Sequence, residues 1–190
     1  MKRTFIAIPV DASPILREIM VQLHAQFRGE AIKWVDPVNF HVTVRFLGDT
    51  PDEMMPPIAA AMRAACREVR ACPGRVRGLD YFTYKGTPSV LFACIDGWEG
   101  VPLLAAMLDR ELEELGFPPG DHPFKAHLTL ARIRNLHDKN RFKEVIAPLR
   151  EKEFQEAEAS RIIHYESILR PQGPLYKPLA VIPLSGGTLT

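Results

Sequence analysis

The apolar and polar positions of the chain follow short repeating patterns that predict a mixed α+β protein. Apolar and β-branched runs predict strands at residues 4–10, 40–47, 75–84, 89–95, 124–132, 157–169 and 176–184. Apolar residues at helical spacing predict helices from Ser13-Pro14 to Gly29 and at about 52–70, 100–115 and 138–150. The 17 prolines lie mostly at the boundaries of these segments, as expected of residues that end regular structure.

The same order of elements occurs twice along the chain. A strand, a helix, a strand with a His-x-Thr motif, a helix and a strand follow one another in residues 1–86 and again in residues 87–190. The separation between an aromatic residue and the motif histidine is also alike, at 36 and 35 residues: Phe5 to His41, and Phe92 to His127. This pattern predicts a single domain over 1–190 with two pseudo-symmetric lobes facing each other across a cleft. A coincidental match in a generic α+β chain is the alternative.

Two His-x-Thr motifs carry the candidate chemistry: His41 with Thr43, and His127 with Thr129. Because alternate side chains of a strand share a face, each motif turns an imidazole and a hydroxyl to one side and aliphatic residues to the other. Arg45 is expected on the face of the first motif. Two facing imidazoles suit a displacement in which one histidine accepts a proton and the other donates one. An exposed polar strand face is the alternative for each motif taken alone.

Further groups near the motifs are candidates for binding a phosphoryl group. Threonine hydroxyls can donate hydrogen bonds to its non-bridging oxygens, and cationic side chains can add charge. Besides Arg45, Lys125 has the strand parity of His127, whereas Arg132 reaches the cleft only if the strand bulges or ends there. A solvated surface charge is the alternative for each of these cations.

Composition and charge restrict the classes of function. The chain has 190 residues with 24 Lys plus Arg against 23 Asp plus Glu, and this near balance argues against a purely electrostatic nucleic-acid binder. Three cysteines without a CxxC motif disfavour a disulfide framework and an all-cysteine zinc site, and indicate a reducing cytoplasm. The apolar run from Phe5 to Val10 is too short for a signal peptide or a membrane span.

Aromatic residues near the motifs and at a turn are candidates for stacking on a terminal base. They are Trp34, Phe40, Phe124 and Tyr176, and core packing is the alternative for each. The remaining histidines lack a partner pattern, so structural or exposed roles are expected for His24, His137 and His164. His122 lies five residues before His127, which fits no usual zinc-ligand spacing, so no metal is expected.

The doubled motif and its surroundings resemble the 2H phosphoesterases. The closer resemblance is to the bacterial and archaeal RNA 2′,3′-cyclic phosphodiesterases, also called the 2′-5′ RNA ligase family. The similarity covers nearly the whole chain and is carried by RTFIAIPV near the N-terminus and by residues 33–48, 115–133 and 168–179. It implies an α+β fold of two pseudo-symmetric lobes, each an antiparallel sheet with helices on its outer face, around a central groove.

The resemblance also implies an activity and the residues that perform it. The reaction is metal-free hydrolysis of an RNA-terminal 2′,3′-cyclic phosphate to a 2′-phosphomonoester, with reverse 2′-5′ ligation as a related activity. By position, His41 matches the proton donor and His127 the proton acceptor. Thr43 and Thr129 match the phosphate-binding threonines. No cofactor is implied, and we expect a cytoplasmic monomer that acts on RNA termini.

Two other functions remain open on the sequence. A cyclic phosphodiesterase acting on a small nucleotide would keep the chemistry and change the substrate. A non-catalytic module that binds RNA or a nucleotide would use the groove without turnover. The paired histidines favour an enzyme, because binding needs only hydrogen-bond donors whereas acid–base catalysis needs two titrating groups.

Overall fold

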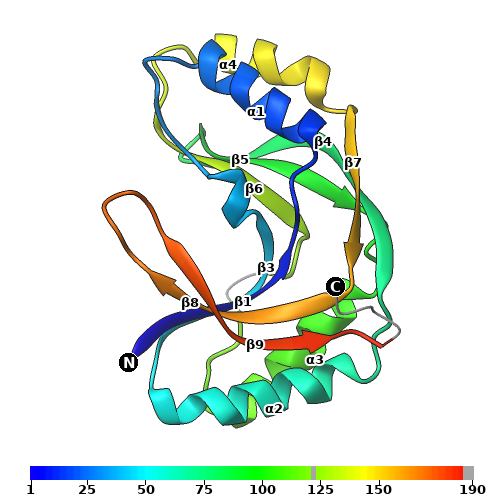
Figure 1. The fold of residues 1–190 in the computed structure, drawn as a ribbon. Coiled ribbons are helices and arrows are strands. Elements are labelled where there is room, and N and C mark those ends of the chain that lie inside the picture. The colour runs from blue at the N-terminus through cyan, green and yellow to red at the C-terminus, as the bar shows by residue number, and fades with distance from the viewer. Residues whose placement is uncertain (121–122, 186–190) are drawn as a thin grey trace.

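Two antiparallel β-sheets with helices on their outer sides form the protein (Figure 1), as the predicted fold class required. The computed structural model describes residues 1–120 and 123–185. The first sheet has the strand order β3 (His41–Thr50), β1 (Lys2–Pro9), β8 (Arg161–Ile168) and β9 (Leu175–Pro183). The second has the order β2 (Ala31–Trp34), β6 (His127–Asn135), β5 (Thr87–Asp96), β4 (Cys72–Tyr84) and β7 (Glu153–Ala159).

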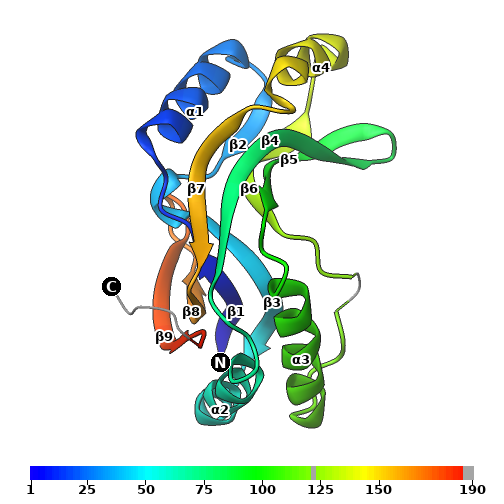
Figure 2. The same ribbon diagram turned by 90° about the vertical axis from the view of Figure 1, so that its right-hand side faces the viewer.

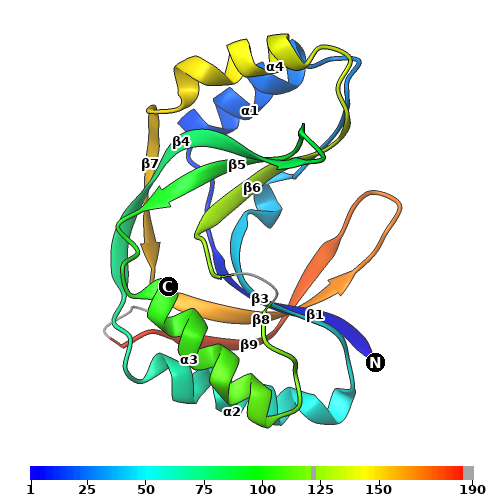
Figure 3. The same ribbon diagram turned by 180° about the vertical axis from the view of Figure 1, so that it is seen from behind.

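The α-helices cover the sides of the sheets that face away from each other (Figures 1 and 2). They are α1 (Pro14–Gln26), α2 (Met55–Cys66), α3 (Val101–Glu114) and α4 (Lys139–Ile146), with short 3₁₀ turns η1 (Pro37–Asn39), η2 (Asp52–Met54) and η3 (Ala147–Leu149). Helices α1 and α4 cover the second sheet, where Phe142 contacts Phe27 and Tyr81 at ring-centroid distances of 5.3 Å each. Helices α2 and α3 lie against the first sheet, as the view from behind also shows (Figure 3).

The sheets do not coincide with the two halves of the sequence. Neighbouring strands β1 and β3 belong to the first sheet, and the corresponding pair β5 and β6 belongs to the second. However, α1 from the first half covers the second sheet, and α3 from the second half covers the first (Figure 1). The halves 1–86 and 87–190 are therefore interleaved, and neither could bury its apolar surface alone. The internal repeat itself stays a prediction.

Several predicted boundaries were wrong. The strand expected at 157–169 is two strands, because the chain leaves the second sheet after Ala159 and enters the first at Arg161. The helix expected at about 52–70 begins as the turn η2 and ends at Cys66. The strand expected at 124–132 begins at His127. Asp121 and His122, which were expected to lead into that strand and to bind no metal, lie outside the described residues.

Across the described parts of the chain, no helix is long and apolar enough to cross a membrane.

His164 is a fully buried polar residue on the face of the first sheet that packs against the helices. It pairs with Ile6 across the strands and is 0% exposed. Among the described residues neither of its ring nitrogens has a hydrogen-bond partner. Burial therefore disfavours the imidazolium and lowers the pKa of His164 to about 4.

This burial predicts that the protein loses stability in mild acid. Below a pKa of about 6.5 the unfolded chain binds a proton at His164 that the folded chain excludes until about pH 4. The free energy of unfolding should fall by about 3 kcal/mol over this interval from His164 alone. Urea denaturation at several pH values should show a shallower decline for His164→Leu than for the wild type. The control His24→Gln removes an exposed histidine and should retain the wild-type slope. Parallel slopes for wild type and His164→Leu would contradict the prediction.

Candidate active site

The two His-x-Thr motifs lie at the place where the two sheets meet. Strands β3 and β6 approach each other with Cα–Cα distances of 8 Å or less. The segment between β2 and β3 crosses from one sheet to the other, and the Val35 amide donates to the carbonyl of Leu130 on β6 at 2.9 Å. Asp36 then caps the turn η1 by accepting from the Val38 amide, so the chain enters β3 at a fixed position. The crossing therefore holds the first motif against the second.

Both motif histidines make the same backbone hydrogen bond. His41 Nδ1 lies 2.7 Å from the carbonyl oxygen of Asn39, and His127 Nδ1 lies 2.7 Å from that of Lys125. A carbonyl oxygen can only accept, so Nδ1 carries the proton in each ring. In the neutral form, Nε2 is then the unprotonated nitrogen. Each Nε2 can accept a proton, or donate one after the ring has been charged.

Aromatic rings support both imidazoles. Phe5 and Tyr176 contact His41 at centroid distances of 5.0 and 5.2 Å. Phe82 and Phe92 contact His127 at 5.1 and 5.4 Å. Phe5 and Phe92 are the residues whose spacing to the motifs matched in the sequence. Neither residue was predicted to belong to the site, although the matching spacing was a signal for both of them.

Register shows which side chains share a face with the histidines. His41 and Thr43 pair with Pro9 and Ala7 on β1, so they lie on one face of the first sheet. His127 and Thr129 pair in the same way with Cys94 and Phe92 on β5. Both threonines are half-buried. Within each motif the imidazole and the hydroxyl therefore share a face, as the alternation predicted.

Arg45 lies on the opposite face from His41, and its expected position was wrong. The β1–β3 register shifts between Ile6 and Ala7, which leaves Val44 as an extra residue and reverses the alternation. Arg45 consequently pairs with Ile6, and its side chain is directed toward α3. There its Nε lies 2.9 Å from Asp109 Oδ1, and its guanidinium also donates to the carbonyl of Pro118. Arg45 thus joins β3 to the helix layer.

A second bulge has the opposite effect on Arg132. The β5–β6 register shifts between Leu91 and Phe92, with Leu130 as the extra residue. Arg132 pairs with Val90 and therefore shares the face of Thr129 and His127. Its charge is one of the causes that lower the pKa of His41. The strand therefore has the bulge that Arg132 needs in order to point toward the groove.

The environment of His41 disfavours its charged form. Burial is the main cause that lowers its pKa, and the charges of Arg132 and His127 act in the same direction. The hydrogen bond to the carbonyl of Asn39 opposes them. The contribution from His127 also shows that the two imidazoles lie within electrostatic reach of each other.

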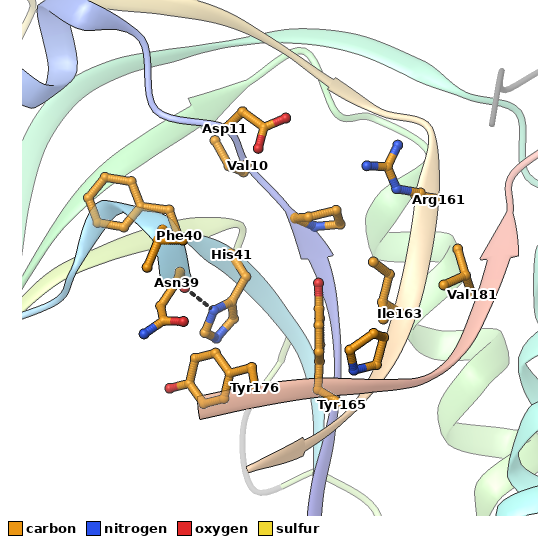
Figure 4. Close-up of a pocket in the computed structure, with 13 residues that line it drawn as sticks. Val10, Asp11, Asn39, Phe40, His41, Arg161, Ile163, Tyr165, Tyr176 and Val181 are labelled. Atoms are coloured by element: carbon orange, nitrogen blue, oxygen red, sulfur yellow. Dashed lines mark hydrogen bonds between the residues drawn. The ribbon is translucent and has the colours of Figure 1, made fainter. Parts of the chain in front are cut away.

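A cavity of about 560 Å³ opens beside His41 and is lined by residues of the first sheet (Figure 4). Tyr176 and Tyr165 form part of its wall, and Asp11 and Arg161 line it away from the histidine. Asn39 fixes one side of the cavity, because its side-chain amide donates to the carbonyl of Pro174 at 3.2 Å. Clefts of this size hold ligands as large as a nucleotide.

Comparison with known proteins shows which family the chain belongs to. A family model for LigT-like phosphoesterases matches residues 6–92 and 99–176. The chain belongs to this phosphoesterase family. The expected resemblance to the 2H phosphoesterases is therefore confirmed.

Relatives of this phosphoesterase share most of its length. A Thermotoga maritima protein named RNA 2′,3′-cyclic phosphodiesterase is 31% identical to it, and the match covers 98% of each chain. A Thermus thermophilus protein of the same name is 33% identical over 97% of this chain and 91% of the relative. A crystal structure of a Thermus thermophilus protein superposes with a TM-score of 0.75 at 30% identity, covering 96% of this chain and 97% of that one. E. coli LigT complexed with 3′-AMP has the same fold, with a TM-score of 0.74 at 22% identity, covering 97% and 98% of the two chains.

The predicted base-stacking residues lie in different parts of the phosphoesterase. Tyr176 lines the cavity beside His41. Trp34 instead contacts His24 on α1 and Phe27 directly after α1, at centroid distances of 5.7 and 6.4 Å, so its candidate place in the groove was wrong. Its strand partner Ala131 lies on the helix-covered face, which explains this position. Two further candidates, Phe40 and Phe124, pack against the hydrophobic core.

Lys125 lies close to the second motif of the phosphoesterase. Its carbonyl holds His127, and its Nζ lies 5.4 and 5.7 Å from the ring centroids of Phe92 and Phe82. The ammonium group is therefore beside the aromatic pair that supports the imidazole. Within the described ranges, no three His, Cys, Asp or Glu side chains are grouped as a metal site requires.

The two backbone hydrogen bonds predict the tautomer of each motif histidine. Neutral His41 and His127 should both carry their proton on Nδ1, because the carbonyls of Asn39 and Lys125 accept from that nitrogen. Long-range ¹H–¹⁵N correlation spectra at a pH where both rings are neutral will report which nitrogen is protonated. Exposed His24 provides the reference signal. A proton on Nε2 in either motif would contradict this geometry.

Proposed function

We propose that this phosphoesterase hydrolyses the 2′,3′-cyclic phosphate at the end of an RNA to a 2′-phosphomonoester. The observation that carries the proposal is the pair of imidazoles, His41 and His127, each held through Nδ1 so that Nε2 is free for proton transfer. The relatives from Thermotoga maritima and Thermus thermophilus carry the name of this activity. Near-neutral net charge suits contact with an RNA end, since wrapping a long strand requires many Lys and Arg contacts.

The proposed reaction is a single in-line displacement at phosphorus. A water oxygen bonds to the phosphorus while His127 Nε2 accepts the proton of that water. The bond from phosphorus to O3′ breaks, and His41 donates its Nε2 proton to O3′. The products are a 2′-phosphate and a free 3′-hydroxyl. In-line geometry requires the two histidines on opposite sides of the phosphorus, which suits their location on different sheets.

Other side chains on the motif faces stabilise the phosphoryl group in this proposal. Thr43 and Thr129 donate hydrogen bonds to its non-bridging oxygens. Arg132 supplies positive charge from the face of the second motif, and Lys125 supplies it from the chain before β6. Arg45 has no part in this set, because it binds Asp109 on the other side of its sheet.

The donor role of His41 depends on the substrate. In the free protein its lowered pKa favours the neutral ring, whereas a proton donor must begin charged. An anionic phosphate placed beside the ring favours the imidazolium and raises that pKa. Substrate binding and protonation of His41 are therefore coupled in this mechanism.

A small cyclic nucleotide is a second candidate substrate. The cavity of about 560 Å³ beside His41 is large enough for one nucleoside, so a single cyclic mononucleotide could use the site without further RNA. Reverse 2′-5′ ligation would use the same two proton carriers in exchanged roles. The proposal also includes a cytoplasmic monomer that requires no metal.

The proposal predicts activity that needs both histidines and no divalent ion. An oligoribonucleotide ending in 2′,3′-cyclic phosphate should be converted to the 2′-phosphate in the presence of EDTA. His41→Ala and His127→Ala should each lower turnover by about 10²-fold or more, the usual contribution of a positioned acid or base. Thr43→Ala and Thr129→Ala should each lower turnover by less than either histidine change, by about 10-fold, which corresponds to the loss of one hydrogen bond to a charged group. Chromatography of the products measures all of these rates.

His24→Ala is the control for this series, because it removes an exposed histidine from α1. Activity that EDTA abolishes and a divalent ion restores would contradict the metal-free mechanism. Full activity in either motif variant would contradict the two-histidine mechanism. Tight substrate binding without turnover in the wild type would support the non-catalytic binding module instead.

The assignment of roles predicts which variant a better leaving group will rescue. With a 3′-bridging phosphorothiolate the leaving sulfur hardly needs protonation, so the substrate should substantially restore turnover in His41→Ala. His127→Ala should remain impaired, because its water still lacks a base. Single-turnover rates for both variants on the oxygen and sulfur substrates test this. Rescue of His127→Ala alone would reverse the two roles.

A further inference from the structure

Two opposite charges line the cavity at a distance from the histidine. Asp11 follows strand β1, and Arg161 begins strand β8; both line the cavity that His41 also lines (Figure 4). Among the described residues, the side chains of Asp11 and Arg161 form no ion pair with each other or with any other group. The carboxylate and the guanidinium are therefore both available to a ligand.

Tyr165 connects this charged end of the cavity to the aromatic end. Its hydroxyl is directed toward the region of Asp11 and Arg161 (Figure 4). Burial is the main cause that raises the pKa of this hydroxyl; the charge of Arg161 opposes it and that of Asp11 adds to it. Its ring lies 6.2 Å from that of Tyr176, which contacts His41. The cavity thus leads from an imidazole, past two aromatic rings, to a carboxylate and a guanidinium.

Acidic residues next to Asp11 and Arg161 restrict the kind of group that can bind at this end of the cavity. A second cavity of about 210 Å³ shares Asp11 and Arg161 with the first and is also lined by Glu156 and Glu158. These three carboxylates repel an anion, so a second phosphate of an RNA strand is a poor ligand for Arg161. An uncharged group with both hydrogen-bond donors and acceptors is a better ligand for this end of the cavity.

Guanine has the edges that match both side chains. Its N1–H and N2–H₂ groups are adjacent donors for the two oxygens of a carboxylate, and its O6 and N7 atoms are adjacent acceptors for the fork of a guanidinium. Adenine, cytosine and uracil each lack at least one of these adjacent pairs. With the cyclic phosphate at His41, the base of the same nucleotide would extend along Tyr165 toward Asp11 and Arg161.

We propose that Asp11 and Arg161 form a base-reading site that favours guanine at the nucleotide carrying the cyclic phosphate. Asp11 accepts from N1–H and N2–H₂, and Arg161 donates to O6 and N7. The inference rests on the proposed function, because it places the phosphate at the histidines. It adds the identity of the terminal base to the substrate.

The test compares the four nucleoside 2′,3′-cyclic phosphates as substrates. Wild-type kcat/KM should be about 10-fold or more higher for guanosine than for the other three, as expected for bidentate reading of a base. Asp11→Asn replaces one carboxylate oxygen by an NH₂ group, which repels the N1–H and N2–H₂ groups of guanine. Arg161→Gln removes the paired N–H donors of the guanidinium. Each variant should lose most of the preference for guanosine and change the rates on the other three substrates by about 2-fold or less.

Matched controls carry the same chemical changes on the outer helix α3. They are Glu113→Gln and Arg110→Gln, both at exposed positions, and both should keep the wild-type preference. Equal rates on all four substrates in the wild type would overturn the proposal. Arg161 would instead be a contact for the preceding phosphate if Arg161→Gln impaired only longer oligonucleotides, whatever their terminal base. That outcome would also overturn the proposal.

A binding measurement separates this proposal from the proposed function. Calorimetric titration with the four nucleoside 2′-monophosphates needs no turnover, and guanosine should bind about 10-fold or more tightly than the others. Guanine preference in binding without hydrolysis of any cyclic phosphate would support the base-reading site and contradict the proposed function. Hydrolysis without any base preference would support the proposed function and contradict the base-reading site.

Discussion

The site depends on one repeated interaction, the hydrogen bond from an imidazole Nδ1 to the carbonyl two residues earlier. This bond fixes the ring and its tautomer at His41 and at His127. Both β3 and β6 begin at the histidine itself. One local interaction therefore orients each ring and determines which of its nitrogens is available for proton transfer.

The two halves of the groove share this geometry but differ in their charges. A bulge at Val44 turns Arg45 into the helix layer, where it binds Asp109, while a bulge at Leu130 places Arg132 on the motif face. The second lobe therefore supplies the positive charge, and that charge helps to keep His41 neutral in the free protein. Two similar motifs therefore have different charged side chains on their groove faces.

The interleaving of the halves explains why the groove is stable enough to hold this geometry. After β1 in the first sheet, the chain continues into helix α1, which covers the second sheet. After β2 in the second sheet, the chain returns to the first sheet as β3. Residues from both sheets and from all four α-helices belong to one hydrophobic core within the described chain. Separation of the lobes would expose part of that core, so the hydrophobic effect opposes an increase in the distance between the two motifs.

The sequence by itself determined most of the helices and strands and the two motifs, because hydrophobic periodicity and His-x-Thr spacing are local properties. The family followed from the resemblance of those motifs and their flanking residues to known phosphoesterases. The sequence also indicated that Phe5 and Phe92 occupy matching positions. Tertiary structure decided the directions of Arg45 and Arg132, since a bulge depends on the register with a neighbouring strand. It likewise placed Trp34 against α1 and brought Asp11 and Arg161 to one cavity. Residues so distant along the chain meet only through the pairing of β1 with β8, which no local pattern specifies.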